Sequence, residues 1–486
     1  MYIRKIKSRG STCFQIGRKR YGKFVLLKHV GCTSVPSLLP ALKNKAQKEL
    51  KRLIFLNQLS FWPDTDEKKT KAQLLNWKIT GFHRFFGPIY DLVGFPQNFL
   101  RDLTVARIVY PKSKLATARY LTCRLSIPTT KDKIYRFMDK MSKAKLTKIA
   151  YGFIKKKNQK ISLVFYDVTT LYFEIEKEDR VRRKGYSKDH RHDMPQILIG
   201  LFVDKDGYPF DYDFFEGKTF EGHTFKKAVK SLLKKYSFKD LTVVADAGML
   251  SHDNLSFLEK EGLFYIVAAR LKNLKKDLIE RVLSHDYLSN PFYERRWQNK
   301  KFIVGFCKKR AKRDKQNRNR LIKTLKLKLN KKQQVIRKSK YLKVSGEKKI
   351  LGIDQQKIKE DQRFDGLKGY FTNHKFLPAT QIAQQYRNLW QVEKAFRMSK
   401  NDLKERPVFH QKNERVASHL LLCFCSLLVA KEAERQLSSA GHSLARAIEI
   451  LSSVGEGEAI IGKFKMPIEK KLGKEAKQIL NISEGH

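Results

Sequence analysis

Apolar and polar positions follow different periods in successive parts of this chain. Residues 1–35 alternate apolar and basic side chains between glycines, which predicts a small β-rich unit with a basic surface. Residues 36–155 carry apolar side chains at helical spacing, as in Phe99, Leu103 and Ala106, so we expect a helical region there.

Beyond the helical region the pattern becomes that of an α/β protein. The apolar run 161–166 predicts a strand. A second strand over 196–203 leads through an Asp-Gly turn into a third over 210–216. A helix over 224–236 and a strand ending at Ala245 follow. The predicted fold class is therefore α/β, with a mixed sheet and flanking helices.

The strand and helix pattern is interrupted after Arg270 and returns near residue 369. The intervening strands are short, so we interpret this segment as a β-rich insertion into one domain. An apolar helix over 416–430 is predicted to pack behind the sheet. Six regions result: a basic β unit (1–35), a helical region (36–155), the first half of the core (156–270), the insertion (271–368), the second half of the core (369–432) and a C-terminal helical region (433–486).

The net charge of the chain indicates a binding partner. Lys and Arg number 102 against 48 Asp and Glu, a formal net charge of +54. Self-repulsion of that size indicates a polyanion such as double-stranded DNA. A genome-wide Lys bias would not also lower the acidic count. The helical region 36–155 and the basic run 308–320 are therefore candidate DNA-binding segments, the latter with Lys308, Lys309 and Arg310.

Cysteine usage and the chain ends indicate a reduced, cytoplasmic protein. None of the six cysteines forms a CxxC pair, so neither a zinc site nor a disulfide framework is indicated. Cys423 and Cys425 lie in an apolar run and are expected to be core thiols. The N-terminus has no apolar signal region, and the run 420–430 is too short to span a bilayer, so no membrane partner is expected.

Three acidic residues occupy positions suited to metal-dependent chemistry. Asp167 follows the first predicted strand of the core, Asp246 follows the last, and Glu393 lies in the helical stretch 381–400. Carboxylates are the oxygen ligands that Mg²⁺ and Mn²⁺ prefer. Two such ions about 4 Å apart can activate a water and stabilise a leaving oxygen on phosphate. We expect the three carboxylates to converge within roughly 4–8 Å.

The helix with Glu393 carries further candidate residues. Tyr386, Glu393 and Lys400 are spaced by seven residues, so they share one face of a continuous helix. Trp390 fits either core packing, which we favour, or stacking on an unpaired base. Glu393 also has an alternative role, a salt bridge to a cation of its own helix: Lys394, Arg397 or Lys400.

Taken together, these motifs resemble the DDE transposases of bacterial insertion sequences. The likeness is to the group whose last acid lies in a Tyr-Arg-Glu-Lys helix motif. Tyr386, Glu393 and Lys400 match that motif in register, whereas Leu389 occupies its Arg position. Three further segments look like this family: 166–170, 185–191 and 245–249.

The resemblance implies a ribonuclease H-like catalytic core with an insertion, and two divalent ions, Mg²⁺ or Mn²⁺, bound by Asp167, Asp246 and Glu393. It implies hydrolysis at transposon ends, followed by attack of the freed 3′-OH on target DNA. Tyr386 and Lys400 would contact DNA near the scissile phosphate. We also expect a homodimer on DNA, in the nucleoid of a bacterial cytoplasm.

Leu389 leaves the role of the motif's Arg to another residue. We favour Arg397, which continues the stripe of Glu393 on a continuous helix, over Arg387, which is displaced by two positions. The departure also keeps open a second function, that of a catalytically inactive DNA-binding descendant of a transposase. A third possible function is that of a ribonuclease H-like nuclease that only hydrolyses.

Two other polar groups are weaker metal candidates. The histidines at 190 and 192 with the acids at 189 and 193 lie in a basic loop, which favours DNA contact or solvent exposure over metal binding. Asp211, Asp213 and Glu216 form a second acidic group, in which strand alternation puts Asp211 and Asp213 on one face. They fit surface or supporting roles better than a ligand role.

Overall fold

The structure is a computed structural model, and it describes residues 1–8, 10–20, 22–59, 72–174, 178–188, 191–249, 251–297, 300–330, 340–344, 350–406, 408, 412–461 and 464–484. The chain divides into two compact units. The first comprises residues 1–72 with 461–463, and the second comprises residues 73–460 with 464–486.

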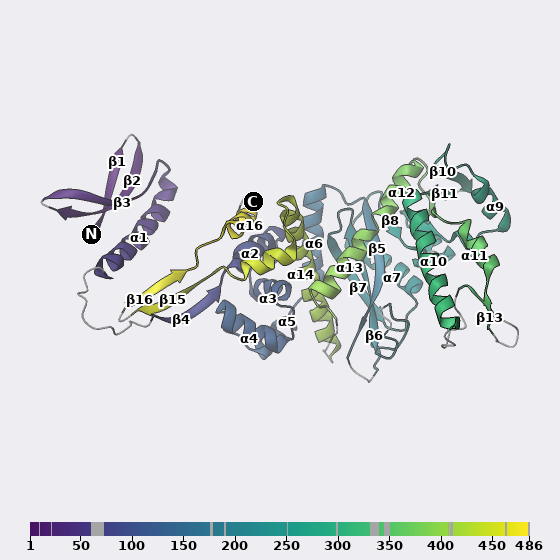
Figure 1. The fold of residues 1–486 in the computed structure, drawn as a ribbon, viewed down its shortest axis with the longest axis horizontal. Helices are drawn as coiled ribbons and strands as arrows, with labels where there is room; N and C mark the ends of the chain where they lie inside the picture. The colour runs from purple at the N-terminus through teal and green to yellow at the C-terminus, as the bar shows by residue number, and fades with distance from the viewer. Residues whose placement is uncertain are drawn as a thin grey trace. The chain divides into compact units, whose positions relative to one another are not determined.

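The first unit is a three-stranded antiparallel sheet with one helix. The strands are β1 (Tyr2–Ser8), β2 (Ser11–Arg20) and β3 (Lys23–Thr33), in the order β1-β2-β3, and α1 (Leu39–Leu59) packs on them (Figure 1). Phe14, Ile16 and Ala46 are buried between sheet and helix. The boundary predicted at residue 35 therefore falls inside this unit.

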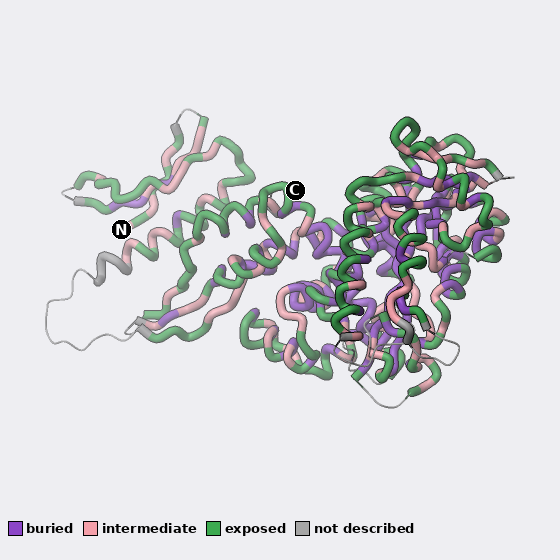
Figure 2. The backbone as a smooth tube through the Cα atoms, turned by 45° about the vertical axis from the view of Figure 1, so that its right-hand side comes forward, coloured by how far each residue is buried: buried purple, intermediate pink, exposed green. Residues whose placement is uncertain are grey.

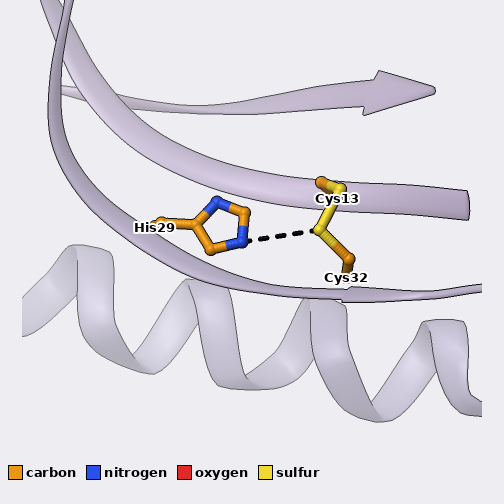
Figure 3. The surroundings of a disulfide bond; sticks show 3 residues. All are labelled: Cys13, His29 and Cys32. Carbon is orange, nitrogen blue, oxygen red and sulfur yellow. Dashed lines mark hydrogen bonds between the residues drawn. A yellow bond between two sulfur atoms is a disulfide. The ribbon is translucent and has the colours of Figure 1, made fainter. Parts of the chain in front are cut away.

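A disulfide in this unit overturns the cysteine prediction. Cys13 and Cys32 are directly opposite each other on β2 and β3, with Cα atoms 4.0 Å apart, and their sulfurs are bonded. His29 Nε2 lies 3.4 Å from Cys32 Sγ (Figure 3). The spacing of 19 residues did not reveal the pair because the register of the hairpin brings the two cysteines together. Cys423 and Cys425 are buried thiols, as predicted.

The second unit is built on a mixed sheet of eight strands in the order β10-β11-β14-β9-β8-β5-β6-β7 (Figure 1). β5 is parallel to β8, and β8 to β9, whereas β6 is antiparallel to both of its neighbours. β14, β11 and β10 continue the sheet with antiparallel pairing. The strands are β5 (Leu163–Tyr172), β6 (Gln196–Asp204), β7 (Pro209–Glu216), β8 (Thr242–Ala245), β9 (Phe264–Ala269), β10 (Phe292–Trp297), β11 (Lys300–Phe306) and β14 (Leu367–Thr372).

The predicted strand order of the core is confirmed, with one shift that matters for chemistry. The first strand does not end at Tyr166 but continues to Tyr172, because the β-branched and apolar residues after Asp167 also pair with β6. Asp167 therefore lies within β5 rather than at its end. Asp246 directly follows β8, as predicted.

Helices enclose the sheet and form the predicted helical region. Most begin at a side-chain cap, such as Asn98, Ser113, Thr130 and Ser142, whose oxygen accepts a backbone N–H. Helices that precede or flank the first core strands are α2 (Gly81–Val93), α3 (Phe99–Val109), α4 (Lys114–Leu125), α5 (Lys131–Met138), α6 (Lys143–Asn158), α7 (Glu221–Lys235) and α8 (His252–Lys260).

One long apolar helix, α14 (Asn413–Ser439), lies in the core of the second unit. It contacts α2, α3, α5, α6 and β7, and Figure 2 shows the burial concentrated around it and the large sheet. Its length and composition would suffice to cross a membrane, but 94% of its most apolar window is buried inside the protein. Its apolarity is therefore that of a core helix.

The insertion differs from the β-rich segment that was predicted. It contains the helices α9 (Lys276–Ser284), α10 (Lys308–Asn330) and α11 (Gln355–Gln362). Its strands β10 and β11 extend the large sheet, and β12 (Leu342–Val344) and β13 (Ile350–Ile353) form a small hairpin. The basic run 308–320 makes up the first half of α10, because Lys and Arg are good helix formers.

The C-terminal region was predicted to be helical but also contains strands. β15 (Gly455–Ile461) and β16 (Phe464–Glu469) join β4 (Ala72–Ile79) in a sheet of order β16-β15-β4. The helices α15 (Leu444–Leu451) and α16 (Lys474–Glu484) flank these strands in sequence.

The helix predicted over 381–400 is broken into pieces. α12 (Ala379–Arg387) ends at a turn, α13 (Trp390–Arg397) begins directly after it, and a π-helical turn follows over Met398–Asp402. The break at 388–389 and the π-helical turn interrupt the continuous helix on which the shared face of Tyr386, Glu393 and Lys400 was predicted, so that shared face stays a prediction.

Candidate active site

The register of the central strands places two of the predicted acids side by side. Tyr166 of β5 pairs with Ala245 of the parallel strand β8. The next residues along both strands are Asp167 and Asp246, which therefore point to the same face of the sheet from neighbouring positions. The negative charge of Asp246 is close enough to contribute to raising the pKa of Asp167.

Asp167 is held in a largely buried position. Only 18% of its side chain is exposed, and its Oδ1 accepts the Val168 N–H at 2.8 Å. Burial is the main cause that raises the pKa of Asp167 to about 6, against the opposing pull of Lys188. A charged carboxylate at this position is costly in free energy unless a cation compensates it.

Lys188 supplies a cation at this position, and the sequence had assigned it no role. Its Nζ lies 3.8 Å from Asp167 Oδ1 and 3.1 Å from Glu221 Oε1. Burial is the largest single effect on the Lys188 pKa and lowers it, but Asp167 and Glu221 together raise the pKa above its usual value. The loop of Lys188 is fixed by the Lys188 N–H, which donates to Thr170 Oγ1 at 3.2 Å.

Glu221, at the start of α7, is a fourth carboxylate near the acid pair. Its Oε1 is buried and accepts no hydrogen bond within the described chain, although the Lys188 ammonium lies nearby. No local sequence signal marks Glu221, because the fold of three separate elements brings it to Asp167.

Asp246 begins a tight turn through Gly248, where a side chain would crowd the Asp246 carboxylate. Its Oδ1 accepts the N–H of Gly248. A Cβ atom on Gly248 would come within 2.8 Å of that same oxygen and 3.8 Å of Glu221 Oε2. The missing side chain therefore lets the Asp246 and Glu221 carboxylates approach the same small region.

Glu393 reaches the same neighbourhood from α13. This helix packs on β5 and β6, and Glu393 itself is exposed. Burial raises the pKa of Tyr386 above its usual range, and Asp246, Glu393 and Asp167 add to the increase, so all three acids lie within electrostatic range of one hydroxyl. Within the described ranges, however, no three acidic, His or Cys side chains have a geometry that could hold a metal.

Tyr386 also connects the acids to the basic residues of the insertion. Its ring lies 5.1 Å from that of Tyr370, centroid to centroid, and the Lys368 ammonium lies 5.0 Å from its centroid. Burial raises the pKa of Tyr370, and the positive charges of Arg310 and Arg387 lie close enough to oppose this increase.

The remaining predicted DNA contacts have mixed environments. Arg387 and Arg397 are exposed, as are Lys308 and Lys309 in the first turn of α10, while Arg310 is half-buried. Lys400 is buried in the π-helical turn. Burial raises the pKa of the neighbouring Glu405, and the positive charge of Lys400 opposes this increase. A DNA contact by Lys400 stays a prediction.

Several weaker candidates now have structural environments. Trp390 is 46% exposed, which contradicts the core packing favoured from the sequence. Asp211 is buried with Lys235 Nζ at 2.9 Å, and Lys143 Nζ lies 2.6 Å from Asp213, so both acids form ion pairs.

The basic loop 185–193 is described only in part. The residues at 189 and 190 lie outside the described ranges. His192 Nδ1 accepts the Ser187 N–H at 3.2 Å, so this ring is engaged within its own loop.

Comparison with known proteins identifies the family of this chain. A family model for the transposase DDE domain matches residues 158–429, more than half of the chain. The chain belongs to this family. The matched segment contains β5, β8 and α13, the elements that carry Asp167, Asp246 and Glu393.

Two solved structures are similar over part of their length. A piggyBac transposase synaptic complex with hairpin DNA shares 11% identity over 76% of this chain and 78% of that chain, with a TM-score of 0.40. A Mos1 transposase paired-end complex shares 11% identity over 46% of this chain and 67% of that chain, with a TM-score of 0.17. A search of curated proteins finds no match.

Proposed function

We propose that this protein is a DNA transposase that binds insertion-sequence ends and carries out metal-dependent cleavage and strand transfer of the cut-and-paste type. The observation that supports this most directly is the adjacency of Asp167 and Asp246 on parallel strands of a transposase-family domain. The net charge of +54 supports double-stranded DNA as the partner. A homodimer on DNA in a bacterial cytoplasm completes the proposal.

The proposed fold of the core is ribonuclease H-like. The order β7-β6-β5-β8-β9, in which only β6 runs against the others, supports this proposal. In such a sheet the acid within β5 and the acid after β8 share one face, and α13 can add a third from above.

The proposed ligands of two Mg²⁺ or Mn²⁺ ions are Asp167, Asp246 and Glu393. Asp167, largely buried beside Asp246 and 3.8 Å from the Lys188 ammonium, fits a position for cations. Bound divalent ions would neutralise charge on the phosphate and lower the pKa of an attacking water. In this proposal Glu393 joins the two aspartates from α13, and Tyr386 would contact DNA beside Glu393.

A second candidate function follows from Leu389. This residue is buried at the position where the motif has Arg, so its side chain cannot bind a phosphate. This departure supports a DNA-binding descendant without catalysis.

The test is Mg²⁺-dependent cleavage and strand transfer on DNA that carries the inverted repeats flanking the gene. We expect cleavage at the repeat ends and joining to a target, both lost without divalent cation. Binding without cleavage would support the inactive descendant. Cleavage without joining would support a ribonuclease H-like nuclease that only hydrolyses.

A further inference from the structure

A polar cavity of about 410 Å³ lies between β9, α10 and β14, next to the proposed catalytic centre. Basic and acidic side chains line it together. Lys368 of β14 joins the cavity to the centre, because it lines the cavity and its ammonium also faces the ring of Tyr386.

The carboxylates of this cavity already have cationic partners. The Asp365 carboxylate accepts hydrogen bonds from both terminal guanidinium nitrogens of Arg318, at 2.5 and 2.7 Å. Asp361 forms ion pairs with two lysines of the cavity wall, Lys272 and Lys340. Asp314 Oδ2 lies 3.6 Å from Arg310 Nε.

Lys368, unlike the cations of these ion pairs, has no carboxylate partner within the described residues. In the part of the chain that the structure describes, no carboxylate lies within ion-pair distance of its ammonium. Burial lowers the pKa of Lys368 most, and the neighbouring positive charge of Arg310 lowers it further. A partly buried ammonium beside a second cation costs free energy that an anion in the same space would remove.

Arg310 has unused hydrogen-bonding capacity on the same side. Its Nε is buried and donates no hydrogen bond within the described chain, since Asp314 lies beyond hydrogen-bond distance. Arg310 also lies in the first turn of the 23-residue helix α10, where backbone N–H groups add positive potential.

We propose that Lys368 and Arg310 form a subsite for one backbone phosphate of the DNA strand that enters the catalytic centre. This inference rests on the proposed function. An Arg fork can bind two phosphate oxygens, and a Lys adds a point charge, so the pair suits a phosphodiester. Because Asp246 is also within electrostatic range of Lys368, the bound phosphate would lie beside the reacting one, and both residues would act as positioning residues.

The first experiment compares Lys368→Met with wild type for binding to a duplex of the gene's flanking repeats, in EDTA and at several KCl concentrations. We expect the slope of log affinity against log salt to fall by about 1, as for the loss of one phosphate contact. Lys368→Arg should restore the slope. Lys239→Met removes the same charge from the exposed loop before β8 and serves as the control. An unchanged slope in Lys368→Met would overturn the proposal.

The second experiment locates the phosphate. Single uncharged methylphosphonates are placed along the duplex near the cleavage point, one at a time. We expect one or two positions at which wild type and Lys239→Met lose affinity but Lys368→Met does not. If all three proteins respond alike at every position, the Lys368 subsite is wrong.

A free phosphate could offer the same chemistry as a DNA phosphate. The melting temperature is therefore measured in inorganic phosphate and in chloride at equal ionic strength. We expect the difference in melting temperature between phosphate and chloride to be the same for wild type and Lys368→Met. A phosphate-specific stabilisation that Lys368→Met loses would assign the subsite to a free phosphate, against this proposal.

The two proposals can fail separately. If the wild type binds DNA with the Lys368-dependent slope but neither cleaves nor joins it, the transposase activity fails and the subsite stands. If the wild type cleaves and joins DNA while Lys368→Met shows the same slope and methylphosphonate profile, the subsite alone fails.

Discussion

Single carboxylates carry the proposed chemistry, and the backbone holds them in place. Asp246 is fixed by the N–H of Gly248 on one side and by the register with β5 on the other. Asn at this position keeps the shape and the oxygen that accepts this N–H, but it loses the charge that would hold a cation. The substitution should therefore impair catalysis while leaving the fold intact.

For Asp246→Asn we expect cleavage to fall by at least about 10³-fold with DNA binding largely kept, because phosphate contacts elsewhere supply the affinity. Cleavage of labelled ends in Mg²⁺ and binding by fluorescence anisotropy measure the two effects. Asp253→Asn, at an exposed site in α8, is the matched control. Normal cleavage by Asp246→Asn would exclude Asp246 as a metal ligand.

Lys188 provides a second prediction at the residue scale, because it bridges Asp167 and Glu221. Lys188→Met leaves two neighbouring carboxylates without their cation. We expect the free energy of unfolding of the metal-free Lys188→Met protein to be about 1–2 kcal/mol lower than that of wild type. This loss is smaller than for a fully buried ion pair because a third of the Lys188 side chain is exposed. Mg²⁺ should then raise the melting temperature more in the variant than in wild type, since the ion replaces the ammonium.

The control for this prediction is Lys184→Met, which removes an exposed lysine of the same loop. Differential scanning fluorimetry in EDTA and in MgCl₂ provides the measurement. Equal melting temperatures of Lys188→Met and wild type in both solutions would show that the bridge does not stabilise the acid cluster.

Elements decide what their residues can reach, as the broken helix near Glu393 shows. The sequence favoured Arg397 as the substitute for the missing motif Arg, and that preference assumed a continuous helix. α12 ends at Arg387 and α13 begins at Trp390, so the helix is not continuous. Arg387 lies within electrostatic range of Tyr370, which contacts Tyr386, and this proximity favours Arg387.

We expect Arg387→Ala to weaken binding to the DNA ends several-fold more than Arg397→Ala. The reason is that a guanidinium beside Tyr370 can reach a phosphate near the proposed centre. Binding isotherms of both variants at one salt concentration test this. The opposite ranking would show that the stripe containing Glu393 and Arg397 faces the DNA.

Packing between α3, α4 and α14 gives a pH-dependent prediction at the element scale. Lys114 of α4 is buried, and burial followed by the charge of Arg107 lowers its pKa to about 7. Its Nζ lies 3.3 Å from Nδ1 of His419 on α14. The unfolded chain therefore binds more protons than the folded protein between about pH 7 and 10.5, so this group's contribution to stability rises with pH across that window.

Relative to Lys114→Met, the wild type should gain stability between about pH 7 and pH 10, by at most roughly 4 kcal/mol. Chemical denaturation at several pH values measures the difference. Lys112→Met, an exposed neighbour, should show no such trend relative to wild type. A constant difference between wild type and Lys114→Met over this range would mean that Lys114 is charged throughout.

Elements also show how far the sequence could predict the structure. The apolar runs of the sequence were sufficient to locate the start of β5, the strands β6, β7 and β8, and the helix α14, because long apolar runs bounded by turn residues are buried in the core. The break after Arg387 was missed, since only tertiary packing of α12 and α13 determines it. The ion-pair role of Lys188 and the position of Glu221 were missed because the family-like segment 185–191 does not indicate the partners of Lys188, and the fold alone joins these residues to Asp167.

At the scale of the whole molecule, the excess of basic residues is the dominant electrostatic feature. The sequence predicts that Lys and Arg of residues 1–155 and 300–345 line the side of the acidic residues, and this stays a prediction. Within the second unit, Arg310 of α10 supports it, because this residue lies near Lys368 and Tyr370. A field of this sign would draw DNA toward carboxylates that would otherwise repel it.

The binding of duplex DNA should therefore depend steeply on salt. If six or more phosphates are neutralised on binding, raising KCl from 50 to 200 mM lowers the affinity by about 10³-fold or more, because each contact releases condensed counterions. Anisotropy titrations with a duplex of the repeat ends and with an unrelated duplex distinguish the affinity for any DNA from the additional affinity for the repeat ends. We expect nearly parallel salt slopes for the two duplexes, because phosphate contacts dominate both complexes. An affinity that hardly changes over this range would show that the charge of +54 does not act through the DNA backbone.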